Sequence, residues 1–374
     1  MDERQFIICK DKIEKENFCS LALDHGYVLY YHKSLKVRRM KDFTVIGLAF
    51  SIHPDYPVGR ETPYPLEEQI RMWGGRFIVY QRGRIYTDAT KSLGIFYLVN
   101  GRHQKESRVI SSSVHLLTEL YHLERRNEFE LSFEPREIAS DFYPGPCTPF
   151  VEIRRLMQYE KIDFLSEDFV SEEGIEWNPV YRSWTAEKLS EQLIQYETYM
   201  MREVNKEYKN VYVPLTGGWD SRCVAAICKK AQIPFSTYTE LRTKETHKAG
   251  FSKGDRELPK LLADIWNVKW ELCKPDVIDD NKFKEIIKHS MGMVRNTNLY
   301  SYAYDQYPVD KNNGIILHGA VWGVSREFYG NSISGECNSI RGQERNLRSW
   351  MGELLSESDV HRESIQTWMQ DIHT

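Results

Sequence analysis

Residues 215–222, with the sequence Leu215-Thr-Gly-Gly-Trp-Asp-Ser-Arg222, lie between an apolar run at Val211–Leu215 and a helical pattern at Ser221–Ala231. A glycine pair between a strand and a helix lets the backbone turn sharply and approach a phosphate group closely. In a parallel sheet covered by helices, ligands bind beyond the carboxyl ends of the strands, where N–H groups of the loop and helix face the anion. The stretch therefore predicts a parallel-sheet domain with a pyrophosphate-binding loop.

The side chains of this loop suit phosphate binding. The candidates for contact with the phosphates are Leu215, Thr216, Gly217, Gly218 and Ser221. Asp220 would repel a phosphate by itself, so we interpret it as a ligand of Mg²⁺ that bridges the phosphates. Arg222 can offset negative charge that develops there. The alternative is an ordinary glycine turn capped by Asp220 or Ser221. A Walker A loop is excluded, because no Gly-Lys-Ser/Thr occurs here.

Strand and helix patterns alternate after Trp184, which predicts a parallel sheet covered by helices. The expected strands are Val211–Leu215, Phe235–Glu240, Val268–Leu272 and Gly314–His318. The expected helices are Thr185–Lys206, Ser221–Ala231, Asp255–Trp266 and Asn281–Met291. In the first of these helices Thr185 is the expected N-cap, and the expected apolar face consists of Leu189, Leu193, Tyr196 and Met200.

The first half of the chain is rich in short β-strand patterns. They are Phe6–Cys9, Gly26–Tyr31, Phe43–Ser51, Gly75–Tyr80, Arg84–Asp88, Gly94–Val99 and Arg108–Ser113. Gln81-Arg82-Gly83 predicts a hairpin with glycine at the turn, and residues 114–124 have helical spacing. We expect the domain boundary between residues 165 and 185, with domains at residues 1–175 and 176–374.

Length and composition narrow the class of protein. The chain has 374 residues and a formal net charge of −4, so it lacks the basic excess typical of nucleic-acid binders. Its 7 cysteines are scattered, with no CxxC pair, which disfavours a zinc site and a disulfide framework. No apolar run is long enough to span a membrane. We therefore expect a cytoplasmic protein that binds neither nucleic acid nor membranes.

The loop at residues 215–222 resembles the pyrophosphate loop of the N-type ATP pyrophosphatases, whose usual form is Ser-Gly-Gly-x-Asp-Ser. Within that group it is most similar to the asparagine synthetase superfamily. Two later stretches are similar in order and spacing, Gly254–Val268 and the glycine-rich Leu317–Gly330. In the first half, the stretches similar to the glutaminase-like domain of that superfamily are Gly75–Tyr97, Ile110–Ser113 and Pro146–Phe164.

The resemblance implies two folds. One is an α+β sandwich of the Ntn-hydrolase type at residues 1–175, and the other is a doubly wound α/β domain of the adenine nucleotide alpha hydrolase type at 176–374. It implies ATP and Mg²⁺ as cofactors, and a carboxylate and an amine, small molecules or peptides, as substrates. The implied catalytic residues are Asp220, Arg222 and Glu327, with Asp220 as the metal ligand. Thr239 and Gly319, at strand ends, would flank the nucleotide.

Three departures from the family pattern matter. Glutamine-using members have cysteine after the initiator methionine, where this chain has Asp2, and Cys9 is expected to be a buried, inert thiol. We therefore expect that glutamine hydrolysis is lost. Acidic residues of the family's later loop are replaced by Ala320-Val321-Trp322, which leaves Glu327, and Glu327 could equally pair with Arg326 on the surface. The chain after Gly330 is shorter than the family's helical tail. Either the acceptor site is built differently, or a partner chain (a homodimer or partner subunit) completes it, or catalysis is impaired.

The sequence thus leaves two functions open. The first is ATP-dependent amide-bond formation through an acyl-adenylate. The second is a non-catalytic nucleotide-binding or scaffold subunit of a biosynthetic complex. His318 could touch a nucleotide or be a core histidine, residues 242–254 could be a lid or a solvated loop, and the tyrosine-rich Tyr300–Tyr307 could line an acceptor pocket or belong to a core.

Overall fold

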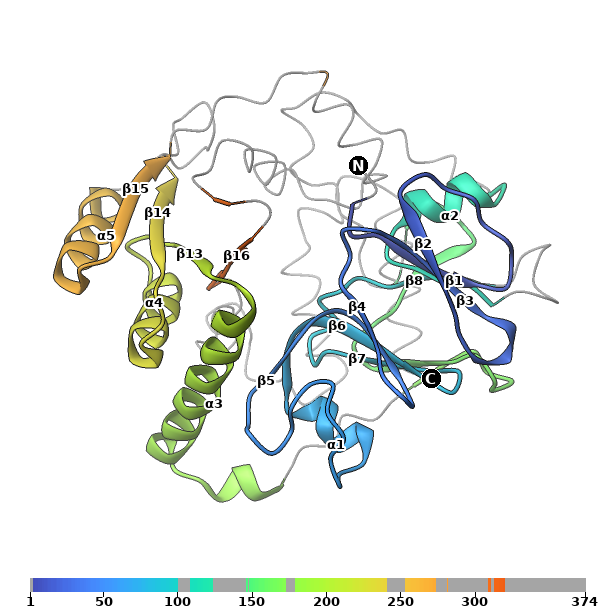
Figure 1. Ribbon diagram of the computed structural model, residues 1–374, viewed down its shortest axis with the longest axis horizontal. Helices are drawn as coiled ribbons and strands as arrows, with labels where there is room; N and C mark the ends of the chain where they lie inside the picture. Colours follow the sequence, from blue (N-terminus) through green and yellow to red (C-terminus); the bar gives the residue numbers. More distant parts are fainter. Residues whose placement is uncertain are drawn as a thin grey trace, which may run out of the picture.

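The computed structural model describes residues 3–99, 108–123, 146, 148–172, 179–240, 253–273, 281, 309–310 and 313–319 (Figure 1). Within these residues helices and strands are mixed, and the strands form three sheets. Two six-stranded antiparallel sheets come from the part of the chain before residue 173. A four-stranded parallel sheet comes from the part after residue 209.

The antiparallel sheets contain strands from across the first half of the chain. The first sheet has the order β10 (Ile153–Arg155), β8 (Phe96–Leu98), β9 (Ile110–Ser111), β1 (Phe6–Cys9), β3 (Val28–His32) and β2 (Phe18–Ala22). The second has the order β12 (Val170–Glu172), β11 (Glu160–Asp163), β7 (Arg84–Thr87), β6 (Trp73–Gln81), β5 (Thr44–Ser51) and β4 (Val37–Arg39). The short helices here are η1 (Asp24–Gly26), α1 (Leu66–Arg71) and α2 (Val114–Leu120).

The hairpin between β6 and β7 is confirmed. Gln81 pairs with Arg84, and the two turn residues, Arg82 and Gly83, have φ angles of 49° and 83°. Two consecutive positive φ angles define the tight turn that matches the twist of the flanking strands. Glycine is the residue that reaches this conformation at no steric cost, so the sequence signal has a direct physical reason.

The two antiparallel sheets share one apolar core. Ile8 and Leu29 of the first sheet and Ile46 and Ile78 of the second are fully buried in the same cluster. Period-two alternation along these strands directs such side chains toward the partner sheet. The first half therefore closes its core with its own strands.

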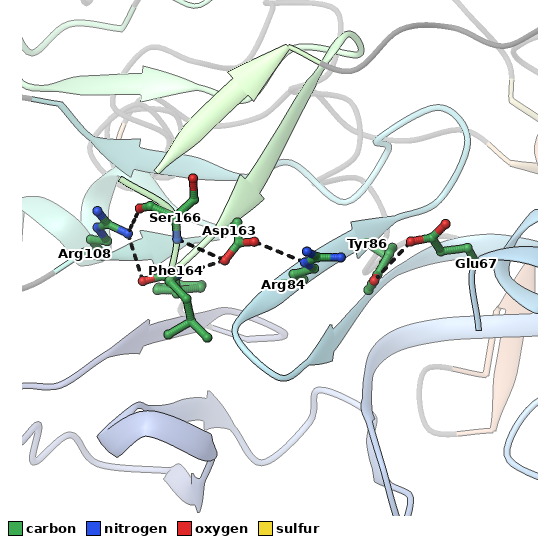
Figure 2. Close-up of polar contacts among 8 residues, drawn as sticks. Glu67, Arg84, Tyr86, Arg108, Asp163, Phe164 and Ser166 are labelled. Atoms are coloured by element: carbon green, nitrogen blue, oxygen red, sulfur yellow. Dashed lines mark hydrogen bonds and ion pairs between the residues drawn. The ribbon is translucent and has the colours of Figure 1, made fainter. Parts of the chain in front are cut away.

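A polar network crosses between the sheets at one edge (Figure 2). Arg108, just before β9, donates from Nη1 to the carbonyl of Phe164 at 2.9 Å and also to that of Ser166. Asp163, at the end of β11, accepts a hydrogen bond from Arg84 Nε at 3.1 Å and one from the backbone N–H of Ser166 at 3.3 Å. Because Arg108 directly precedes β9 of one sheet and Asp163 ends β11 of the other, the network connects the turn after β11 to both sheets.

The second half begins with η3 (Pro179–Ser183) and α3 (Ala186–Glu207). The strands that follow are β13 (Asn210–Pro214), β14 (Ser236–Glu240), β15 (Lys269–Cys273) and β16 (Gly314–Ile316), with α4 (Trp219–Ala231) and α5 (Lys253–Trp266) between them. Their order in the sheet is β15-β14-β13-β16. Helix α4 packs against β13, and α5 packs against β14 and β15.

Helix α3 starts as predicted but buries a different face. The Thr185 hydroxyl accepts a hydrogen bond from the backbone N–H of Lys188 at 3.3 Å, which confirms the N-cap. The predicted apolar face is wrong at Leu189 and Leu193, which are 40% and 42% exposed. The buried residues are Thr198, Met201 and Val204. The reason is that α3 packs against β5 and α4 (Figure 1), and Met201 and Val204 near its C-terminal end join the buried cluster that those two elements share.

Other sequence predictions differ from the structure in extent. Strands β2, β4, β10, β11 and β12 were not predicted, because runs of three to five residues carry little periodic signal. Strand β16 is half-buried rather than fully buried. The predicted helix Asn281–Met291 lies outside the described residues apart from Asn281. No helix among the described residues is long and apolar enough to cross a membrane.

Candidate functional site

The loop at residues 215–222 joins β13 to α4 at the carboxyl edge of the parallel sheet. From β13 the chain proceeds to β14 and β15 on one side, and it reaches β16 on the other side of β13. The loop after β13 therefore lies where the direction of strand addition reverses. Crevices that bind ligands in open parallel sheets form at this position.

Hydroxyl groups organise the start of the loop. Thr216 N–H donates to Ser221 Oγ at 3.0 Å, and the two hydroxyls lie 3.1 Å apart. Gly218 N–H donates to Thr216 Oγ1 at 3.1 Å. The side chain of Ser221 is buried, and Leu215 is fully buried beneath the loop. Thr216 and Ser221 thus hold the turn in shape through hydrogen bonds within the loop.

The backbone N–H of Gly217 makes its hydrogen bond to helix α5 rather than within the loop. Its N–H donates to Oδ1 of Asp255, in the first turn of α5, at 2.9 Å. A Cβ atom at Gly217 would lie 3.0 Å from the carbonyl oxygen of Gly254. A side chain at position 217 would therefore be tight against the start of α5.

Helix α4 begins at Trp219, with Gly218 as an N-cap that makes no side-chain capping bond. Arg222 Nε donates to the Gly218 carbonyl at 3.1 Å, and its guanidinium lies 4.6 Å from the centre of the Trp219 ring. The Trp219 side chain is 66% exposed. Asp220, also in the first helical turn, is half-buried. The first turn of α4 thus combines N–H groups without a side-chain cap, one carboxylate and one guanidinium.

Thr239 lies at the end of β14 and is buried. Its hydroxyl donates to the Leu215 carbonyl at 2.8 Å and accepts from Trp270 Nε1 at 2.9 Å. These two bonds use the hydroxyl to join the loop base to β14 and β15. The structure therefore gives Thr239 a supporting position beneath the loop.

Gly319 follows β16 and touches the start of α4. A Cβ atom at this position would lie 2.5 Å from the Asp220 carbonyl carbon and 2.8 Å from the Ser221 nitrogen. Real Cβ atoms do not approach backbone so closely, so only glycine fits here. The preceding residue, His318, is exposed, and desolvation lowers the pKa of its imidazole while the Glu240 carboxylate acts in the opposite direction.

The structure brings together most of the residues selected from the sequence. Those that meet around the loop are Leu215, Thr216, Gly217, Gly218, Asp220, Ser221, Arg222, Thr239 and Gly319. Glu327, Ala320–Trp322 and Tyr300–Tyr307 lie outside the described residues, as does nearly all of the 242–254 segment. Asp255 was missed as a loop contact, because its place at a predicted helix start marks the helix but does not indicate Gly217 as its partner.

Metal ligands are sparse in the described residues. They contain no group of three or more His, Cys, Asp or Glu side chains that could hold a metal ion. Mg²⁺ is commonly held by one or two carboxylates together with substrate phosphates and water. Asp220 alone is compatible with that mode of binding, and the phosphates would have to supply further ligands.

Cys9 has the properties of a structural thiol. It lies in β1 and is fully buried, and burial raises its pKa to about 12. A neutral thiol is a weak nucleophile, because the thiolate is the reactive form. The prediction that Cys9 is buried is confirmed, its inertness stays a prediction, and Asp2 lies outside the described residues.

No protein-family model matches this chain, and no curated protein matches it significantly.

Proposed function

We propose that this protein is an ATP-dependent amide-bond-forming enzyme of the asparagine synthetase type. An oxygen of the substrate carboxylate attacks the α-phosphorus of ATP, the bond to the bridging oxygen breaks, and pyrophosphate leaves. The amine nitrogen of the second substrate then attacks the acyl carbon, loses a proton and displaces AMP. The proposed source of the nitrogen is that amine rather than glutamine, and the burial of the Cys9 thiol in β1 is in keeping with this proposal.

The observation that carries the proposal is the contact between Gly319 and the Asp220–Ser221 backbone. It joins the loops that follow β16 and β13, which are neighbouring strands on the two sides of the reversal in strand order. Strand–glycine–helix loops at such a reversal present N–H groups to a phosphate. Two observations support a polyphosphate ligand over an ordinary capped turn in this proposal. Gly218 makes no side-chain cap, and a side chain at position 319 would collide with the Asp220–Ser221 backbone.

Each residue of the loop has a task in this proposal. The first turn of α4 stabilises the departing pyrophosphate through backbone N–H groups, and Arg222 offsets its charge. Thr216 and Ser221 keep the turn in shape. Mg²⁺, when bound, supplies charge neutralisation between the phosphates and Asp220. The location proposed for this chemistry is the cytoplasm.

The alternative is a non-catalytic nucleotide-binding or scaffold subunit of a biosynthetic complex, alone or as a homodimer. One observation favours it: Thr216, Gly217 and Gly218 already donate their N–H groups to the protein's own oxygen atoms. A loop that is saturated internally can serve as a structural turn.

Substrate-dependent exchange of labelled pyrophosphate into ATP separates the two functions. We expect exchange when the protein is incubated with Mg·ATP and a panel of amino acids, peptides and sugar acids. Complete absence of exchange with every carboxylate and with partner extracts would favour the non-catalytic subunit. The matched variant is Asp220→Asn, which preserves side-chain shape. We expect it to weaken Mg·ATP binding by about tenfold or more, as loss of a charged metal ligand does, and unchanged affinity would contradict the metal role.

A further inference from the structure

The N–H groups of the loop differ in the kind of atom that they bond. Thr216 and Gly218 donate to neutral hydroxyls within the loop, Ser221 Oγ at 3.0 Å and Thr216 Oγ1 at 3.1 Å. Gly217 donates to the Asp255 carboxylate at 2.9 Å, across a separation of 38 residues. Among these three amides, Gly217 alone has a charged acceptor, and that acceptor belongs to another element.

A carboxylate oxygen on a glycine-loop amide has the charge and the position expected of a phosphate oxygen. The start of α5 packs closely against the loop, since the Gly254 carbonyl oxygen lies 3.0 Å from the position that a Cβ atom of residue 217 would take. The Asp255 side chain is half-buried, so rotation about its side-chain bonds can move the carboxylate away without movement of the helix.

Building on the nucleotide-binding function proposed above, we propose that Asp255 is an internal competitor of the phosphate ligand. Its carboxylate occupies the Gly217 amide in the free protein, and an incoming phosphate must displace it. Displacement leaves two negative groups close together, and their repulsion is strong at short range. A divalent cation between them offsets that repulsion, so Asp255 would favour metal-bound polyphosphates over metal-free ones.

The test uses the full chain and the variant Asp255→Asn, whose amide retains an oxygen that can accept from Gly217 but carries no charge. Isothermal titration calorimetry would measure the affinity for pyrophosphate with a chelator and with Mg²⁺. We expect the variant to bind metal-free pyrophosphate about tenfold more tightly, because a charge-assisted hydrogen bond is replaced by a neutral one. The gain should be much smaller with Mg²⁺ present.

The matched control is Asp264→Asn, which removes the same charge from an exposed position on α5 and should leave both affinities unchanged. Equal or weaker binding of metal-free pyrophosphate by Asp255→Asn would show that Asp255 supports the loop and would overturn the proposal. If neither the unchanged chain nor the variant binds pyrophosphate or ATP, nucleotide binding itself fails. Normal ATP binding with an unaltered preference for metal would overturn the role of Asp255 alone.

Discussion

The first half of the molecule and its parallel-sheet half treat apolar side chains differently. In the first half, Ile46 and Ile78 are fully buried between two sheets of the same segment. In the other half, Leu261 and Ile265 of α5 are 54% and 66% exposed, and Trp219 at the candidate site is exposed as well. The first half also leaves Val151 and Leu165 exposed, and the second half has a buried core of its own that includes Val213. The difference therefore lies in the exposed apolar side chains along α5.

The largest expected effect tests that contrast directly. Ile78→Ala removes a fully buried side chain from the shared core and should lower the free energy of unfolding by about 3 kcal/mol. Ile265→Ala removes the same atoms from an exposed helix face and should change it by less than about 0.5 kcal/mol. Chemical denaturation of both variants provides the comparison. Similar losses would mean that the α5 face is covered in solution.

Gly319→Ala tests the close contact between the residues after β16 and the start of α4. The added methyl group would lie 2.5 Å from the Asp220 backbone, so either β16 or the start of α4 must shift. We expect a loss of about 1–3 kcal/mol in stability, as overpacking commonly produces, and weaker ATP binding. Thermal melting and calorimetry with Mg·ATP would measure them. Gly26→Ala is a steric control, because nothing lies within 4 Å of its added Cβ. Because Gly26 has a positive φ, alanine at this position strains the backbone and lowers stability for a separate reason. Gly26→Ala therefore serves as a control for ATP binding only, and we expect its ATP affinity to be unchanged.

The smallest expected effect concerns the base of the loop. Thr239→Val keeps the side-chain shape but leaves the Leu215 carbonyl and Trp270 Nε1 without their partner. A buried polar group without a hydrogen bond costs about 1–3 kcal/mol. We expect a loss of stability in that range, measured by denaturant unfolding, with Thr239→Ser as the variant that restores the hydroxyl. Equal stability of the valine and serine variants would exclude the support role.

Local signals were predictable where one or two residues determine the geometry. The Arg82-Gly83 turn, the Thr185 N-cap and the loop at 215–222 each follow from backbone preferences or short-range hydrogen bonds. The buried face of α3 was not predictable, since it depends on where β5 and α4 lie. The bond between Gly217 and Asp255 was equally hidden, because it joins residues that are 38 positions apart. Assignment of the two halves to the fold families that they resemble stays a prediction.

Helix α3 finally bears on how the chain can be divided. Met201 and Val204 share a buried cluster with Phe50 of β5 and with Val224 of α4, and the Tyr208 ring that follows the helix lies 6.3 Å from the Phe50 ring. Helix α3 follows the domain boundary predicted near residue 175, but its side chains pack against β5 of the first half as well as α4 of the second. A fragment ending at residue 175 would lack α3, so Phe50 and the apolar face of β5 around it would be exposed to water. We therefore expect the unit that unfolds cooperatively to be larger than the domain that the sequence delimits.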